Sequence, residues 1–186
     1  GRLAVAGQVH GDRIKEVTEP GLFPGHDAMV TRQTGVLLCI SAADCAAVLL
    51  ADPVARVVGA AHSGWRGTAA RISAKTVAEM ERLGADPRRM QAYVSPCIST
   101  EHFEVGPEVA GQFDPLFVRH VEGKPRPYID LKAAIAAQLQ EAGLLPEAIE
   151  VSPHCTYAGT DTFFSYRAQA GQTGRMMGFI GMTEEG

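Results

Sequence analysis

Long hydrophobic runs are absent from this 186-residue sequence, and so are clusters of basic residues. The longest apolar stretches, residues 36–40 and 46–51, are far shorter than the roughly 20 residues that a membrane-spanning helix needs. The formal net charge is −4, which excludes a protein built to neutralise many nucleic-acid phosphates. We therefore predict that neither a membrane nor a nucleic acid is among its partners.

Closely spaced cysteine pairs are also missing. The four cysteines form no Cys-x-x-Cys motif and no rhythm typical of secreted disulfide frameworks; they are Cys39, Cys45, Cys97 and Cys155. No signal-peptide pattern opens the sequence. These features predict reduced thiols and a cytoplasmic protein.

What is present is an ordinary globular composition, with 46% hydrophobic and 20% charged residues. At a mass of 19.8 kDa, about 70% of the surface of the unfolded chain is buried on folding. We therefore predict a single domain over residues 1–186, with a core that needs no disulfide bonds.

Segments with the periodicity of strands alternate with segments of helical periodicity, which predicts a mixed α/β fold. We expect strands at residues 3–9, 28–32, 35–41, 46–51, 56–62, 91–95, 149–152, 162–166 and 176–182, and a loop at 18–27. Helices are expected at 68–83, 107–117 and 131–142, the last of them capped by Asp130. Strands 46–51 and 56–62 are apolar on both faces and should therefore lie between two layers.

The spacing between these two strands brings a cysteine and a histidine together. Residues 52–55 have proline at the second place of a four-residue loop, which predicts a hairpin turn. In that register Ala51 pairs with Arg56, and Cys45 lies directly opposite His62. Opposed residues have Cβ atoms about 4.5–5.5 Å apart on one face. Such a pair suits either a shared zinc ion or a Cys–His nucleophile.

The residues around His62 point to further binding capacity. His62 is followed by Ser-Gly-Trp-Arg-Gly, a turn whose amides and Arg66 guanidinium could hold an anion. A third metal ligand would have to come from one of the other histidines, at positions 10, 26, 102, 120 and 154. His10, like His62, ends a strand beside a glycine, whereas His102, His120 and His154 have the polar surroundings of surface residues.

Several short motifs follow one another in a set order and together resemble the laccase-domain polyphenol oxidase family. They are residues 8–11 (QVHG), 27–31 (DAMVT), 43–52 (ADCAAVLLAD), 61–67 (AHSGWRG), 95–98 (SPCI), 103–106 (FEVG), 163–167 (FFSYR) and 173–176 (TGRM). The resemblance covers nearly the whole chain, although several tens of residues that usually precede the first motif are absent. Members of this family are regarded as purine nucleoside phosphorylases.

The resemblance implies a layered α-β-β-α sandwich and a metal site made of His10, Cys45 and His62. It also implies phosphorolysis of adenosine, inosine and S-methyl-5′-thioadenosine, together with deamination of adenosine. The implied partners are purine nucleosides and phosphate, for a monomer or homodimer. An older label for the family is multicopper polyphenol oxidase.

Three protein ligands would leave the fourth position of a zinc ion open, as in catalytic zinc sites. We expect Asp44 or Glu104 to act as the acid in deamination and Arg66 to hold phosphate in phosphorolysis, with Arg167 and Arg175 as the other options for phosphate. Asp44 could instead orient a ligand histidine. The alternative functions are a copper-dependent phenol oxidase, a metal-free hydrolase that uses Cys45 as its nucleophile, and a non-enzymatic module that binds a metal or a partner. Six histidines are few for a multicopper enzyme.

Overall fold

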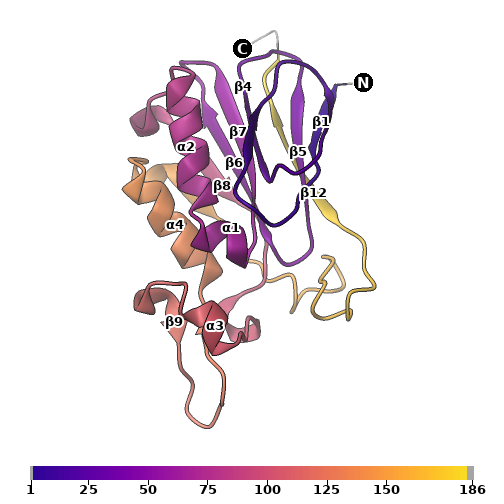
Figure 1. Cartoon of the computed structure of the whole chain (residues 1–186), viewed down its shortest axis with the longest axis vertical. Helices are drawn as coiled ribbons and strands as arrows, with labels where there is room; N and C mark the ends of the chain where they lie inside the picture. Colours follow the sequence, from indigo (N-terminus) through magenta and orange to yellow (C-terminus); the bar gives the residue numbers. More distant parts are fainter. Residues whose placement is uncertain (1, 184–186) are drawn as a thin grey trace.

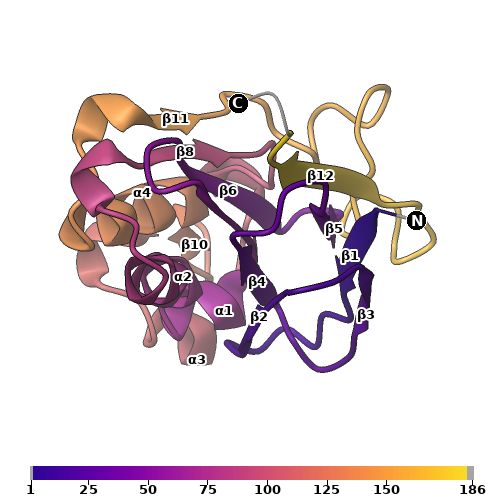
Figure 2. The ribbon, with the colours of Figure 1, turned by 90° about the horizontal axis from the view of Figure 1, so that it is seen from above.

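The computed structural model describes residues 2–183, which form two β-sheets stacked face to face with helices along one side. Figure 2 shows the layers from above: helices α1, α2 and α4 lie against the six-stranded sheet, and the four-stranded sheet lies on its other face. The mixed α/β fold predicted from the sequence is therefore confirmed. The described residues form three layers in the order helices, six-stranded sheet and four-stranded sheet.

The six-stranded sheet has the order β11-β8-β6-β7-β4-β2. Its strands are β2 (Ile14–Glu16), β4 (Ala28–Thr31), β6 (Ala46–Asp52), β7 (Val57–Ser63), β8 (Gln91–Val94) and β11 (Ile149–Val151). The central strands β6 and β7 are almost wholly buried, because helices cover one face and the second sheet covers the other. This confirms that the two predicted hairpin strands lie inside the protein.

The four-stranded sheet has the order β12-β5-β1-β3, with strands β1 (Leu3–Ala6), β3 (Gly21–Phe23), β5 (Leu37–Ala42) and β12 (Met176–Gly181). A row of apolar side chains crosses it in register, from Phe179 through Cys39 and Val5 to Leu22. The two ends of this row, Phe179 and Leu22, are 45% and 66% exposed. The inner face, by contrast, packs against β6 and β7 in a second apolar core.

The helices are α1 (Trp65–Ala69), α2 (Ile72–Arg82), α3 (Pro107–Ala110) and α4 (Leu131–Glu141), and a small pair of strands comprises β9 (Val118–Arg119) and β10 (Tyr128–Ile129). Short 3₁₀ turns occupy Pro87–Arg89, Thr100–His102, Pro115–Phe117 and Pro146–Ala148. Asp130 caps α4 as predicted, since its side chain accepts a hydrogen bond from the Ala133 amide at 2.9 Å. Among the described residues, no helix combines the length and the apolar character that crossing a membrane requires.

The register of the central hairpin differs from the predicted one by two residues. Ala47, not Cys45, pairs with His62, and Asp52 pairs with Val57, so that the loop comprises residues 53–56. Cys45 therefore lies diagonal to His62. Because side chains alternate between the two faces of a strand, a shift of two residues keeps Cys45 and His62 on the same face. The predicted pairing was wrong, yet the two side chains still meet.

The turn chemistry of Asp52 explains this shift. One carboxylate oxygen of Asp52 accepts the amides of Val54 and Ala55 at 2.9 and 3.0 Å, which holds Asp52 in the strand and starts the turn one residue later. Arg56 closes the loop in the left-handed region, with φ of 53°. The hairpin is therefore set by a side chain and not by the position of proline.

Four other predicted elements differ from the structure. The helix expected at 68–83 is interrupted at Arg71, whose φ of 63° is left-handed, so that α1 ends at Ala69 and α2 begins at Ile72. Residues 107–117 form two short helices, because Asp114 precedes proline, a position that disfavours helical backbone, and caps a new turn instead. Residues 162–166 form turns closed on Gly159 and not a strand. The predicted loop at 18–27 contains the strand β3, which the proline and glycine residues on either side obscured.

Substituting Asp52 by alanine should lower the free energy of unfolding by about 2–3 kcal/mol, because the second carboxylate oxygen also accepts the Asp86 amide and the Arg89 guanidinium. Burial raises the pKa of Asp52, but these hydrogen bonds outweigh it and hold the pKa below its usual value. The contribution should therefore be complete above about pH 4 and disappear as the pH falls through the lower folded pKa. Urea unfolding at pH 7 and pH 3 measures both effects. A loss below about 0.5 kcal/mol at pH 7 would contradict this account.

Candidate metal centre and its cavity

The loop after β1 carries His10 and is organised around one buried carboxylate. Asp27, which is fully buried, accepts hydrogen bonds from the amides of Val9, His10 and Gly11 at 3.0, 2.9 and 2.8 Å. His10 itself has a φ of 60°. This left-handed conformation belongs to a loop in which three successive amides point at one anion.

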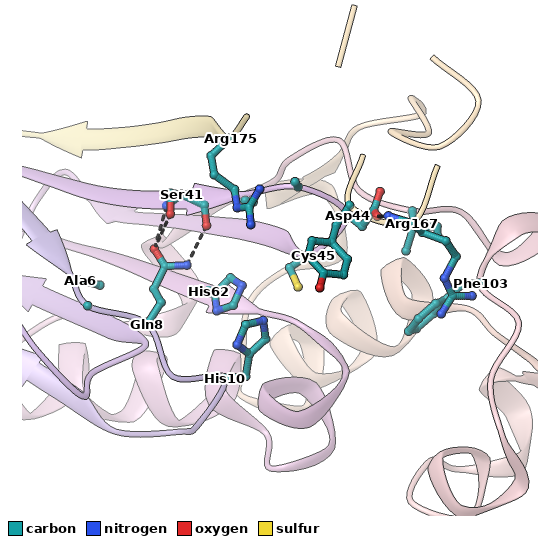
Figure 3. Close-up of a pocket in the computed structure, with 15 residues that line it drawn as sticks. Ala6, Gln8, His10, Ser41, Asp44, Cys45, His62, Phe103, Arg167 and Arg175 are labelled. Carbon is teal, nitrogen blue, oxygen red and sulfur yellow. Dashed lines mark hydrogen bonds between the residues drawn. The ribbon is translucent and has the colours of Figure 1, made fainter. Parts of the chain in front are cut away.

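A side-chain amide ties the same loop to the other sheet. Gln8 donates a hydrogen bond to the Ser41 carbonyl at 2.7 Å and accepts one from the Ser41 amide at 2.8 Å (Figure 3). Ser41 belongs to β5, so the loop that bears His10 is fastened to both sheets. Gln8 thus belongs to the site, although nothing in the sequence beyond its place in a motif indicated a role for it.

Cys45 lies directly before β6, at the edge of the space between the sheets. A Cβ atom placed on Gly64 would lie 2.7 Å from the Cys45 sulfur and 3.6 Å from the His10 ring. Any side chain at position 64 would therefore push into the space between these two groups. The glycine that follows His-Ser in the sequence is required by this close approach.

His62 lies near the end of β7 and is almost fully buried. Its Nδ1 donates a hydrogen bond to the Asp27 carboxylate at 2.9 Å, which leaves Nε2 free to act as a ligand. Burial lowers the pKa of His62, but the Asp27 carboxylate and the Cys45 sulfur outweigh it and raise the pKa to about 9. Asp27, and not Asp44, is thus the carboxylate that orients a ligand histidine.

The structure brings the three predicted metal ligands together. The ligand atoms of His10, Cys45 and His62 all lie within 4.8 Å of one another. Ligands of one tetrahedral zinc ion are about 3.5 Å apart, so modest side-chain movements would complete the coordination. Burial raises the pKa of the Cys45 thiol, but the two imidazoles outweigh it and lower the pKa to about 7, which favours the thiolate that metals bind. The residues therefore fit a zinc ion.

The triad opens into a cavity of about 570 Å³, within the range of small-molecule sites. Figure 3 shows the triad with Gln8 and Ser41 on one side and Phe103 and Arg167 on the other, while Arg175 extends over it. The guanidinium groups of Arg167 and Arg175 donate to main-chain carbonyls. Among the residues that the structure describes, neither arginine forms an ion pair, so the cavity has a positive lining.

The proposed acid Asp44 lines this cavity, but its carboxylate is engaged by another segment. One oxygen accepts the Thr156 hydroxyl and the other accepts the Arg167 amide, both at 2.7 Å. Its backbone has a φ of 84°, directly before Cys45. Asp44 thus connects the residues directly before β6, which include Cys45, to the segment that carries Arg167.

Arg66 and Glu104 are not brought to the cavity with the triad. The exposed Arg66 guanidinium lies over the Trp65 ring, 4.3 Å from its centroid. The Glu104 carboxylate accepts the Tyr128 hydroxyl at 3.1 Å, and only its backbone carbonyl contacts Arg167. Arg167 and Arg175, both in sequence motifs, are the arginines that line the cavity.

Comparison with known proteins gives consistent matches over almost the whole chain. A purine nucleoside phosphorylase of Deinococcus radiodurans is 46% identical over 177 residues, which cover 94% of this chain and 68% of that protein. Adenosine deaminase RL5, from an unknown prokaryotic organism, is 39% identical, with 93% of this chain and 72% of that protein covered.

The fold is equally close to solved structures. The crystal structure of YlmD from Geobacillus stearothermophilus has a TM-score of 0.92 at 36% identity and covers 98% of this chain and 74% of that chain. A family model described as multi-copper polyphenol oxidoreductase laccase matches residues 1–183. The chain therefore belongs to this laccase-domain family of enzymes, whose curated members include purine nucleoside phosphorylases and an adenosine deaminase.

Proposed function

We propose that the protein is a zinc-dependent purine nucleoside enzyme. It cleaves adenosine, inosine and S-methyl-5′-thioadenosine with phosphate, giving the free base and the corresponding ribose 1-phosphate, and it deaminates adenosine to inosine. The observation that carries the proposal is a His–Cys–His triad that shares one cavity with two arginines, neither of which forms an ion pair with a described residue. The names of the relatives agree with this chemistry.

His10, Cys45 and His62 would hold the zinc ion, while Asp27 would fix the His62 imidazole and the backbone of the loop that carries His10. Two imidazoles and a thiolate suit zinc and leave one coordination position toward the cavity. A zinc ion there would supply a Lewis acid at the cavity wall. The protein side chains must then bind the nucleoside and the phosphate beside it.

Arg175 and Arg167 are the groups that can hold phosphate. A guanidinium group binds phosphate oxygens through charge-assisted hydrogen bonds, and neither of these two is neutralised by a described carboxylate. When a phosphate oxygen attacks C1′ of the ribose, the glycosidic C–N bond breaks and its electron pair leaves with the base. Fixed positive charge near the incoming phosphate positions it for that attack.

Two aromatic rings in the cavity lining, Phe103 and Tyr166, offer flat surfaces for the purine. Phe103 is buried and held beneath the Arg167 guanidinium, 5.3 Å from its ring centroid. Tyr166 precedes Arg167, and the backbone amide of Arg167 donates a hydrogen bond to the Asp44 carboxylate. In this proposal Asp44 positions the segment that carries Tyr166 and Arg167.

The proposal is tested by the products formed from adenosine, separated by chromatography, with zinc-loaded protein and with or without phosphate. We expect adenine and ribose 1-phosphate only when phosphate is present, and inosine in both cases because deamination consumes water. Arg175→Ala should lower kcat/KM for phosphate about tenfold and spare inosine formation. Arg66→Ala is the matched control and should change neither.

The possible results separate the hypotheses. If Arg66→Ala and not Arg175→Ala weakens phosphate use, phosphate binds at the turn after His62. If no free base forms from adenosine, inosine or S-methyl-5′-thioadenosine and no inosine forms from adenosine, the protein is not a purine nucleoside enzyme. The copper oxidase alternative predicts several metal ions, whereas residues 2–183 provide one group of side chains with metal-ligand spacing.

A further inference from the structure

A second cysteine–histidine cluster lies outside the metal centre. The Cys155 sulfur is 3.9 Å from Nδ1 of His102 and accepts a hydrogen bond from the Ser99 amide at 3.3 Å. The Ser99 hydroxyl lies 3.4 Å from the same nitrogen of His102. None of these three residues has a role in the proposed function.

The cluster is held rigidly from both sides. The Cys155 backbone forms a bridge with Cys97, and the next amide, that of Thr156, donates to the Cys97 carbonyl at 3.1 Å. The His102 ring packs against the ring of Tyr157, with centroids 4.6 Å apart. The Cys155 thiol and the His102 imidazole are thus held within reach of each other, and the Tyr157 ring orients the imidazole. A thiol beside a positioned base is the arrangement of an activated nucleophile.

The other cysteines lack this setting. Cys39 and Cys97 are fully buried, and burial raises the pKa of both, that of Cys97 to about 12. Cys155 is partly exposed. Burial raises its pKa too, but hydrogen bonds from the Ser99 side chain and from neighbouring backbone amides outweigh this effect and lower the pKa. When a metal ion occupies Cys45, Cys155 is the accessible thiol with the most thiolate character.

We propose that Cys155 is a site of oxidative modification by hydroperoxides, with His102 as the neighbouring proton carrier. The sulfur attacks one oxygen of hydrogen peroxide, an S–O bond forms and the O–O bond breaks. The second oxygen leaves as water after taking the thiol proton through His102. Sulfur loses two electrons, peroxide gains two, and the product is a sulfenic acid.

The position of Cys155 gives this modification a consequence for the cavity. Thr156 follows directly and its hydroxyl donates to Asp44, which also accepts the Arg167 amide. An added oxygen on Cys155 would displace the Ser99 and His102 contacts and shift this connection. We therefore expect oxidised protein to lose nucleoside turnover, a consequence that rests on the proposed function.

The test is peptide mass spectrometry of zinc-loaded protein treated with hydrogen peroxide and dimedone, which traps sulfenic acids. Cys155 should be labelled about tenfold faster than Cys39 or Cys97. His102→Gln should slow this labelling severalfold, whereas His120→Gln, a change at an exposed histidine, should not. Equal labelling rates for the three cysteines, or an unchanged rate in His102→Gln, would overturn the proposal.

Turnover of peroxide-treated protein tests the consequence separately. Wild type should lose activity in step with labelling, and Cys155→Ser should retain it. Labelled wild type with full activity would disprove the connection through Thr156. Because labelling is read by mass, absence of any nucleoside activity would contradict the proposed function without affecting the result at Cys155.

Discussion

Replacing Cys45 by alanine should leave the protein without a bound metal ion and lower nucleoside turnover about a thousandfold or more. The thiolate is the only charged donor of the triad, and two imidazoles alone hold a zinc ion weakly. Because an ion that binds only the folded state stabilises it, zinc should raise the Tm of wild type and not that of the variant. Metal content by mass spectrometry, Tm and turnover are the measurements.

Cys39→Ala is the matched control, since it removes a buried thiol from the other sheet and should keep both the metal and the activity. Chelation of wild type provides the decisive comparison. If chelated protein still turns over and loses activity only on alkylation, Cys45 is the nucleophile of a metal-free hydrolase and the zinc proposal fails. Copper in place of zinc, together with phenol oxidation, would favour the oxidase alternative.

Asp27→Asn should weaken zinc binding by about 10–100-fold, although Asp27 is not itself a ligand. Its two carboxylate oxygens accept four hydrogen bonds, three from the His10 loop and one from His62. An asparagine amide offers one acceptor, and its NH₂ group would face donors. The His62 imidazole would then lose its fixed orientation, and the loop that carries His10 would lose the anion that holds its backbone.

Competition with a chromophoric chelator measures this change in zinc affinity. Asp52→Asn is the control, because Asp52 is also a buried carboxylate that accepts several hydrogen bonds but lies away from the triad. It should lower stability and leave zinc affinity unchanged. Zinc affinity equal to that of wild type in folded Asp27→Asn would show that the loop and His62 keep their places without the carboxylate.

Much of the fold follows from local patterns in the sequence. The buried strands of the central hairpin and the capped helix α4 are predictable because apolar periodicity and an Asp cap are local signals. The hairpin register is not, since it depends on Asp52 accepting amides within the turn. The prediction that Cys45 and His62 share one face still holds, because side chains alternate along a strand with a period of two and the register error is also two residues.

The supports of the site are harder to predict, because they connect segments far apart in the chain. Asp27 contacts residues of the His10 loop and His62. The one signal in the sequence is its position directly before a wholly buried strand, where a buried carboxylate needs hydrogen-bond donors. Asp44 accepts a hydrogen bond from the amide of Arg167, which lies 123 residues later in the chain. The segment that carries Arg167 has no regular secondary structure, so no periodicity reveals its path into the cavity.

The three ligands of the metal centre are anchored unequally. Cys45 adjoins a central strand and His62 belongs to one, so moving either would disturb the best-packed sheet of the protein. His10 is exposed and lies on a loop whose attachment consists of a few hydrogen bonds. Local opening of such a loop is far easier than separation of two central strands. A metal ion that enters the site would therefore bind His10 last, and one that leaves would release His10 first. The rate of metal exchange would then be set by how often that loop opens.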